Sequence, residues 1–166
     1  MGAVEVRELF DDEYAGLVRL AAVITGDAHV GEEVVQEAFA RAVARWRRLR
    51  DYERPGAWLR LVVVRLAVRA RDHRRREPSL AAIPERATPG PDAEVLDLLA
   101  ALRRLTPMQR AAVALFHLED LPVDDVAALL RIPASTVRSH LHRGRAALAP
   151  MLAAGSDAEE AQTHAD

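Results

Sequence analysis

A proline-rich segment divides the sequence into two parts, and both parts have the apolar spacing of helices. Residues 77–93, EPSLAAIPERATPGPDA, contain four prolines and one glycine, a composition typical of a linker. On either side, apolar residues recur at steps of three and four, which is the spacing of one face of an α-helix. No run has the period of a strand. The sequence therefore predicts an all-α protein with two small helical domains joined by a flexible linker.

The part before the linker, residues 1–76, has three apolar stripes of helical spacing. The first stripe ends near Gly26, which can adopt the left-handed conformation that stops a helix, and Asp27 can cap the helix that follows. The second stripe extends to Leu49. The third helix is expected to start after Pro55, since proline disfavours helix at the residue before it. Three helices of this kind can share one core.

The part after the linker, residues 94–152, contains a second helical unit. The letters LTPMQ are typical of a capping box, in which Thr106 caps a helix and Gln109 bonds back to it. A short helix is expected at 123–130, and its first turn is acidic, which suits the helix dipole. A last helix should begin near residue 134 and extend to the end of this unit.

Charge is distributed in blocks along the chain, although the net charge of the whole sequence is only −2. Residues 41–76 contain thirteen arginines and three acids, and residues 131–150 contain four arginines and no acid. The segments around these blocks are acidic, and the small, acidic tail of residues 153–166 is expected to be disordered. Two separate basic blocks favour two contacts with a polyanion, with solvated helix faces as the alternative for either block alone.

The second basic block lies on the last predicted helix, within the stretch RIPASTVRSHLHRGRAAL. On a helical wheel, Val137 and Leu141 share a face that must pack, whereas the polar residues project elsewhere. A turn of about three residues precedes this helix, which is the spacing of a DNA-binding helix-turn-helix, although hairpins in plain helical bundles share it. Arg131 stands where such motifs often have glycine, and a left-handed conformation there would cost arginine about 1 kcal/mol more than glycine.

These motifs, taken together, resemble the extracytoplasmic-function sigma factors of bacterial RNA polymerase. The core-binding helix of sigma region 2 is similar to EEVVQEAFARAVARW, residues 32–46. Region 4 is similar to LTPMQRAAVALFHLEDLPVDDVAALLRIPASTVRSHLHRGRAAL, residues 105–148, and the segment for the minus-ten element corresponds to PGAWLRLVVVRLAVRARDHRRR, residues 55–76. The resemblance implies a region 2 domain, a linker and a region 4 helix-turn-helix domain, at residues 1–76, 77–93 and 94–152.

The resemblance also implies roles for individual residues. The outer face of the second helix would dock on core RNA polymerase through Glu33, Gln36 and Glu37. The last helix would contact the minus-thirty-five element through Thr136, Arg138, Ser139, His142 and Arg143. The third helix and the loop before it would hold the unpaired minus-ten strand through Tyr52, Arg54, Arg60, Arg65, Arg69, Arg71 and Arg74.

Four positions keep an alternative interpretation. Tyr52 could be a stacking platform for a base, whereas Trp58 is expected to lie in the core. Arg65 stands where the family usually has asparagine, so the base that it would recognise is open. His142 could contact DNA, but a packed or solvated role is an equal alternative.

The implied partners are core RNA polymerase, promoter DNA and an anti-sigma factor, and nothing in the residues suggests a cofactor. Two other functions stay open: a free-standing helix-turn-helix regulator that binds DNA without polymerase, and a sigma-like adaptor without promoter recognition. An enzyme is not indicated, since the histidines lack metal-binding spacing and no glycine-rich phosphate loop is present. The lack of cysteine, of a secretory signal and of a long apolar run favours a cytoplasmic protein without a membrane span.

Overall fold

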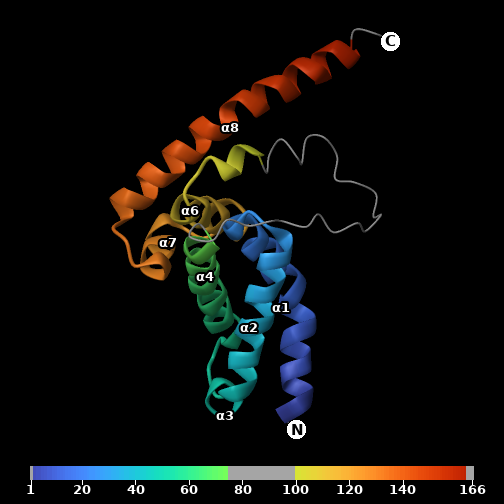
Figure 1. Ribbon diagram of the computed structural model, residues 1–166, viewed down its shortest axis with the longest axis vertical. Coiled ribbons are helices and arrows are strands. Elements are labelled where there is room, and N and C mark those ends of the chain that lie inside the picture. The colour runs from blue at the N-terminus through green and yellow to red at the C-terminus, as the bar shows by residue number, and fades with distance from the viewer. Residues whose placement is uncertain (1, 75–99, 164–166) are drawn as a thin grey trace.

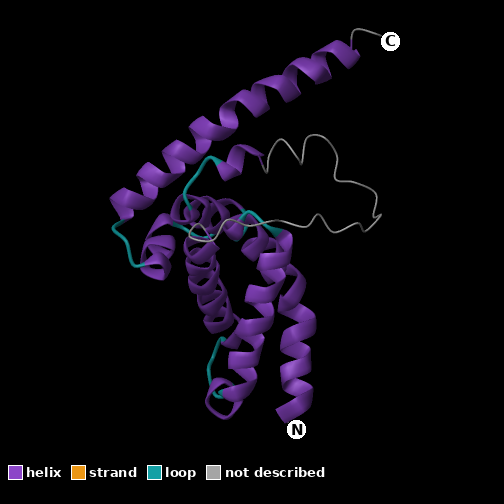
Figure 2. Ribbon diagram, in the orientation of Figure 1, coloured by secondary structure: helices purple, strands orange, loops and turns teal. Residues whose placement is uncertain are grey.

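The computed structural model describes residues 2–74 and 100–163, and side chains within 6–70 and 100–150. All regular structure in these ranges is helical, as the sequence predicts (Figure 2). The predicted linker lies outside the described residues. No helix in the described ranges is long and apolar enough to cross a membrane. The helices are α1 (Gly2–Thr25), α2 (Ala28–Ala44), α3 (Trp46–Leu49), α4 (Pro55–Arg74), α6 (Pro107–His117), α7 (Val123–Leu130) and α8 (Ala134–Thr163).

Helices α1, α2 and α4 lie side by side and form the first helical unit (Figure 1). The turn between α1 and α2 has the predicted features: Gly26 has a φ of 72°, and the carboxylate of Asp27 accepts the main-chain N–H of Val30 at 3.0 Å. Gly31 lets the two helices approach closely. A Cβ at this position would lie 2.6 Å from the main-chain nitrogen of Ala22, so no larger residue fits without moving a helix.

The second helix is shorter than its apolar stripe indicates. The stripe predicts one helix extending to Leu49, whereas α2 ends at Ala44 and the one-turn helix α3 follows. The break is at Arg45, whose φ of −109° and ψ of 8° are not helical. Leu49 is nevertheless buried, because α3 turns it back towards the core.

Helix α4 begins at Pro55, where the missing N–H costs no intrahelical hydrogen bond. Its apolar face is rotated slightly from the prediction. The three-and-four spacing of the apolar residues in this segment would place Leu66 and Ala70 in the core, but both are only partly buried. The buried side chains of α4 are Leu59, Val63, Val64 and Ala67.

The second helical unit begins with the predicted capping box. The hydroxyl of Thr106 accepts the N–H of Gln109 at 3.3 Å, and the side-chain oxygen of Gln109 accepts the N–H of Thr106 at 3.0 Å. At the end of α7, Arg131 has the predicted left-handed conformation, with a φ of 58° and a ψ of 43°. The chain then turns into α8 as the N–H of Ile132 donates to the carbonyl of Ala127 at 3.1 Å.

Helix α8 is longer than the sequence predicts. A disordered tail is expected from residue 153, whereas the structure continues the helix to Thr163 through Pro150. Residues 164–166 lie outside the described residues. In Figure 1 this helix extends well away from the other helices.

The two helical units pack against each other and share one apolar core. Helix α6 contacts both α1 and α4, and its buried residues belong to the same cluster as those of α1 and α4. The buried guanidinium of Arg110 on α6 donates from Nε to the carbonyl of Ile24 at the end of α1, at 2.9 Å. The two predicted domains are therefore in direct contact in this structure.

Candidate nucleic-acid interface

The first turns of α8, residues 134–145, form a polar surface that we call the recognition helix. Val137 and Leu141 point into the core, as the helical wheel predicts. Gly144 lies against α6, because a Cβ there would collide with the side chain of Val113. This packing turns the other side of the helix outwards. The exposed side chains are Arg138, Ser139, His142, Arg143 and Arg145, and Thr136 is partly buried.

The recognition helix has the chemistry that a DNA groove requires. Arg138, His142 and Arg145 follow each other at steps of four and three residues, so they lie on neighbouring positions of the helix surface. The guanidinium group can form two hydrogen bonds to guanine or to a phosphate, and a serine hydroxyl can donate or accept one. No acid is present among residues 131–150, so no carboxylate repels the DNA backbone.

His140 lies between the recognition surface and the core. Burial lowers its pKa from the ordinary 6.5, and the positive charge of Arg143 lowers it further. Its Nδ1 is buried and has no hydrogen-bond partner among the described residues. Burial and the neighbouring arginine therefore both favour the neutral imidazole of His140.

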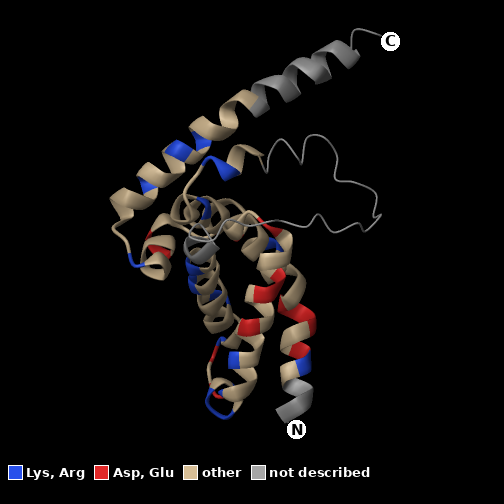
Figure 3. Cartoon of the chain, viewed as in Figure 1, with Lys and Arg blue, Asp and Glu red and all other residues tan. Residues whose placement is uncertain are grey.

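Helix α4 carries arginines to which the resemblance gives a role in holding the minus-ten strand (Figure 3). Arg69 is exposed and Arg65 is partly buried. Arg60 is also partly buried, and its Nε lies 2.8 Å from a carboxylate oxygen of Glu119. The side chains of Arg71 and Arg74 lie outside the described residues.

The loop between α3 and α4 contains the aromatic residue expected to stack on a base. Tyr52 is 51% exposed, and Arg54 beside it is exposed as well. Trp58, in the first turns of α4, packs partly against the core, as expected. An exposed aromatic ring next to an arginine suits the binding of single-stranded nucleic acid, because every base can stack on such a ring.

The outer face of α2 is acidic and polar, as the sequence predicts. Glu33, Gln36 and Glu37 are all exposed on it. Glu37 pairs with Arg41 of the same helix, with an oxygen-to-nitrogen distance of 2.8 Å. His29 approaches Glu33 in the same way, at 3.3 Å. Figure 3 shows that acidic residues gather on α1 and α2, whereas α4 and the recognition helix are basic.

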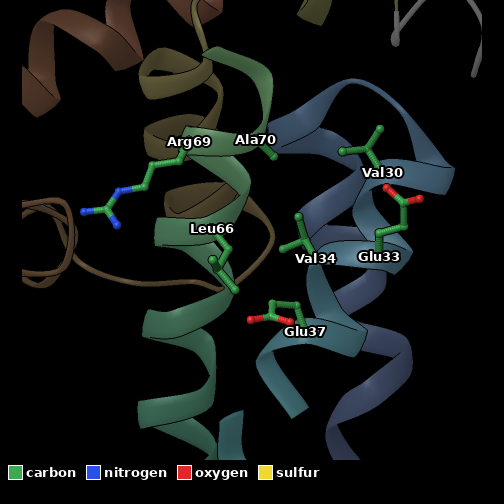
Figure 4. Close-up of a pocket in the computed structure, with 7 residues that line it drawn as sticks. All are labelled: Val30, Glu33, Val34, Glu37, Leu66, Arg69 and Ala70. Carbon is green, nitrogen blue, oxygen red and sulfur yellow. The ribbon is translucent and has the colours of Figure 1, made fainter. Parts of the chain in front are cut away.

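A groove of about 500 Å³ runs between α2 and α4, beside this acidic face. Figure 4 shows Glu37 reaching towards Leu66, while Arg69 points away from α2. The groove combines an apolar floor with two carboxylates. It is lined by Val30, Glu33, Val34, Glu37, Leu66, Arg69 and Ala70.

Two family models match the chain at the places where these surfaces lie. Sigma-70 region 2 matches residues 9–77, and Sigma-70 region 4 matches residues 96–148. The RNA polymerase sigma-E factor of Streptomyces coelicolor is 31% identical over 159 residues, which cover 93% of this chain and 90% of that protein. This chain belongs to the ECF family of RNA polymerase sigma factors. Its resemblance to this family, stated from the sequence, is confirmed.

Two further similarities accompany this match. The ECF RNA polymerase sigma factor SigE of Mycolicibacterium smegmatis is 36% identical over 163 residues, and the alignment covers 87% of this chain but only 60% of SigE. The solved structure of the sigma factor RpoE in complex with the anti-sigma factor NepR, from Bartonella quintana, has a TM-score of 0.70 and 19% identity. The match covers 89% of this chain and 96% of RpoE, so the two share the fold.

Sequence reasoning missed three features of this sigma factor: the groove, the Arg60–Glu119 ion pair and the buried Arg110. The groove and the ion pair depend on how separate helices pack against each other, and no local sequence pattern predicts this packing. Arg110 had a signal, since it lies four residues before the buried Ala114 and thus on the inner face of α6. An arginine on an otherwise apolar helix face can be a buried residue that anchors a neighbouring helix, and not only an exposed residue that binds a partner.

Proposed function

We propose that this sigma factor binds core RNA polymerase in the cytoplasm and directs transcription initiation at specific promoters. Polymerase supplies the chemistry, and this chain supplies the choice of promoter. The observation that supports this most is that two basic surfaces and one acidic face lie on three different helices of one chain. A regulator that binds DNA without polymerase needs only the basic surface of the recognition helix.

The upstream promoter element is proposed to bind the recognition helix, within residues 94–152. The helix would enter the major groove with its first turns, where Arg138 and Arg143 meet base edges or phosphates. Ser139 and Thr136 supply shorter donors near the start of the helix, and His142 supplies one further on. The contacts to bases select the sequence, and those to phosphates set the register.

The melted minus-ten strand is proposed to bind α4 and the loop before it, within residues 1–76. Arginines along α4 would follow the phosphate backbone, and Tyr52 would stack on an unpaired base. Residues 77–93 would connect the two DNA-binding parts. Arg65 replaces the usual asparagine of the family, and a guanidinium at this position favours contact with a phosphate or with guanine.

Core polymerase is proposed to bind the outer face of α2. Glu33, Gln36 and Glu37 form a rigid polar surface there, and the groove beside them can take an apolar side chain. Such a surface suits a basic helix of the polymerase. An anti-sigma factor is a further proposed partner, because the sigma factor RpoE with the same fold was solved with one.

Run-off transcription from genomic promoters, with core polymerase and this chain, tests the proposal. Transcripts that start at defined sites only when both components are present would support it.

Co-purification with core polymerase tests the α2 face. Glu33→Gln combined with Glu37→Gln should weaken the association, whereas Asp124→Asn combined with Asp125→Asn, the same charge change on α7, should not. Tight binding to duplex DNA without polymerase, and no transcription with it, would favour the free-standing regulator.

A further inference from the structure

An arginine proposed to hold the DNA strand is already paired with an acid of the other helical unit. Nε of Arg60 on α4 lies 2.8 Å from Oε2 of Glu119, which follows α6. The two side chains are only 28% and 17% exposed, so the pair is largely shielded from water. The Nε–H group is not aligned for a hydrogen bond, and the contact is therefore an ion pair held by charge and proximity.

The position of Glu119 is set by the loop that contains it. Its own N–H donates to the carbonyl of Ala114 at 3.3 Å, and the N–H of Leu121 donates to that of Leu115 at 3.1 Å. Between these bonds, Asp120 has a left-handed backbone with a φ of 51°. The loop is thus tied to the end of α6, and α6 itself packs on α1 and α4. Glu119 is carried to Arg60 whenever α6 is docked.

A carboxylate and a phosphate compete for the same guanidinium. The carboxylate is planar and the phosphate is tetrahedral, but the oxygens of both groups accept charge-assisted hydrogen bonds from arginine. While Glu119 lies against Nε of Arg60, a DNA phosphate must compete with the acid for this guanidinium. Docking of the second helical unit also covers part of α4, because α6 packs on it.

We infer that Glu119 acts as an internal substitute for a DNA phosphate and that the Arg60–Glu119 pair holds the free sigma factor in a closed, inhibited arrangement. The Arg60–Glu119 pair and the packing of α6 on α1 and α4 support the closed arrangement. Its inhibitory effect rests on the proposed function, in which Arg60 contacts the melted strand. Binding to polymerase and promoter would then separate α6 from α4 and release Arg60.

The distance between the two helical units tests the closed arrangement without reference to DNA. The chain has no cysteine, so Ala40→Cys on α2 and Ala128→Cys on α7 create two unique labelling sites on exposed positions. Electron spin resonance of the spin-labelled free protein should give a short, narrow distance distribution. Glu119→Gln should broaden it towards longer distances. Asp120→Asn is the matched control, because it removes one negative charge from the residue next to Glu119. Asparagine also tolerates the left-handed backbone of this position.

A charge exchange separates the ion pair from general effects on stability. Arg60→Glu and Glu119→Arg should each open the protein, because each places like charges together. The double variant should restore the short distance. If the two single variants and the double variant all keep the wild-type distribution, the pair does not hold the protein closed and the inference is wrong.

Binding of a fluorescent single-stranded DNA oligonucleotide to the free protein tests the inhibitory effect. Glu119→Gln should bind about threefold to fivefold more tightly than wild type, as expected for the loss of a partly exposed ion pair. The closed double-exchange variant should bind no better than wild type. If Glu119→Gln opens the protein but leaves affinity unchanged, the inhibitory role is overturned. Run-off transcription by Arg60→Gln with core polymerase then shows separately whether Arg60 contributes to initiation.

Discussion

The guanidinium of Arg110 donates to the main-chain carbonyl of Ile24, 86 positions earlier in the chain, at 2.9 Å. The same side chain donates to the carbonyls of Leu102 and Leu105, at 3.3 and 2.9 Å, and none of it is exposed. Carbonyls in the last turn of a helix have no intrahelical partner. Arg110 therefore satisfies the end of α1 and the chain that leads into α6 at the same time.

Replacing Arg110 tests this role in stability. Lysine keeps the charge but lacks the planar fork that reaches several carbonyls at once. We expect Arg110→Lys to lower the free energy of unfolding by about 2–4 kcal/mol, since buried carbonyls lose their donors. Denaturant unfolding followed by circular dichroism measures the change. Arg103→Lys, on an exposed side chain, should stay within about 0.5 kcal/mol of wild type.

Two helical glycines make a matched test of the α1–α2 crossing. Gly31→Ala would press a methyl group against the main chain of Ala22, so we expect a loss of about 1–3 kcal/mol. Gly16→Ala meets only the tip of Arg19, at 4.0 Å, and should gain up to about 1 kcal/mol from helix propensity. Thermal unfolding compares the two. Stabilisation by both substitutions would contradict the close approach of the helices.

The left-handed residue between α7 and α8 predicts a stabilising substitution. Arg131→Gly should raise the free energy of unfolding by about 1 kcal/mol, because glycine adopts this backbone without a Cβ clash. Arg131→Ala keeps the Cβ and should gain little, which makes it the control. Chemical denaturation of both variants checks the difference, and equal stability of the two would argue against strain at this position.

The recognition helix predicts how promoter binding depends on two arginines. With core polymerase present, Arg138→Ala and Arg143→Ala should each weaken binding to promoter DNA by about tenfold or more. A titration at several salt concentrations tells the contacts apart: loss of a phosphate contact lowers the salt slope by about one, whereas loss of a base contact leaves the slope and changes sequence preference. Arg103→Ala, outside the recognition helix, should change neither. Normal binding by both variants would exclude this surface.

His140 predicts a pH dependence of stability. Burial and Arg143 lower its folded pKa, while the unfolded chain keeps a value near 6.5. As pH falls below about 6.5, the unfolded chain takes up a proton that the folded protein does not. The free energy of unfolding should therefore decrease from pH 7 towards the lowered pKa, and stay level above pH 7 as far as this group is concerned. His140→Gln should flatten that decrease, and the exposed His142→Gln is the control.

The local features of the fold could be predicted because each is decided by a few neighbouring residues. Asp27 and Thr106 cap the helices that the sequence assigns to them, and Arg131 adopts the backbone expected from its position in the helix-turn-helix. The break at Arg45 was missed, since the apolar stripe continues across it and only packing distinguishes one helix from two. The length of α8 was missed as well, because composition alone indicated a tail.

The relation between the two helical units could not be predicted from periodicity. A proline-rich linker indicates separate domains, but it does not exclude that they dock. Docking depends on Arg110 finding Ile24 and on Glu119 meeting Arg60, and these partners are far apart in the sequence.

The length of α8 has a mechanical consequence. Thirty residues of helix span about 45 Å, and the recognition helix, residues 134–145, occupies only the first two-fifths of that length. The remainder is a lever arm whose far end amplifies any rotation of the near end. A small tilt of the recognition helix in a groove would sweep the distal end through a much larger arc, so a reporter dye attached there would register docking that is hard to see at the site of contact.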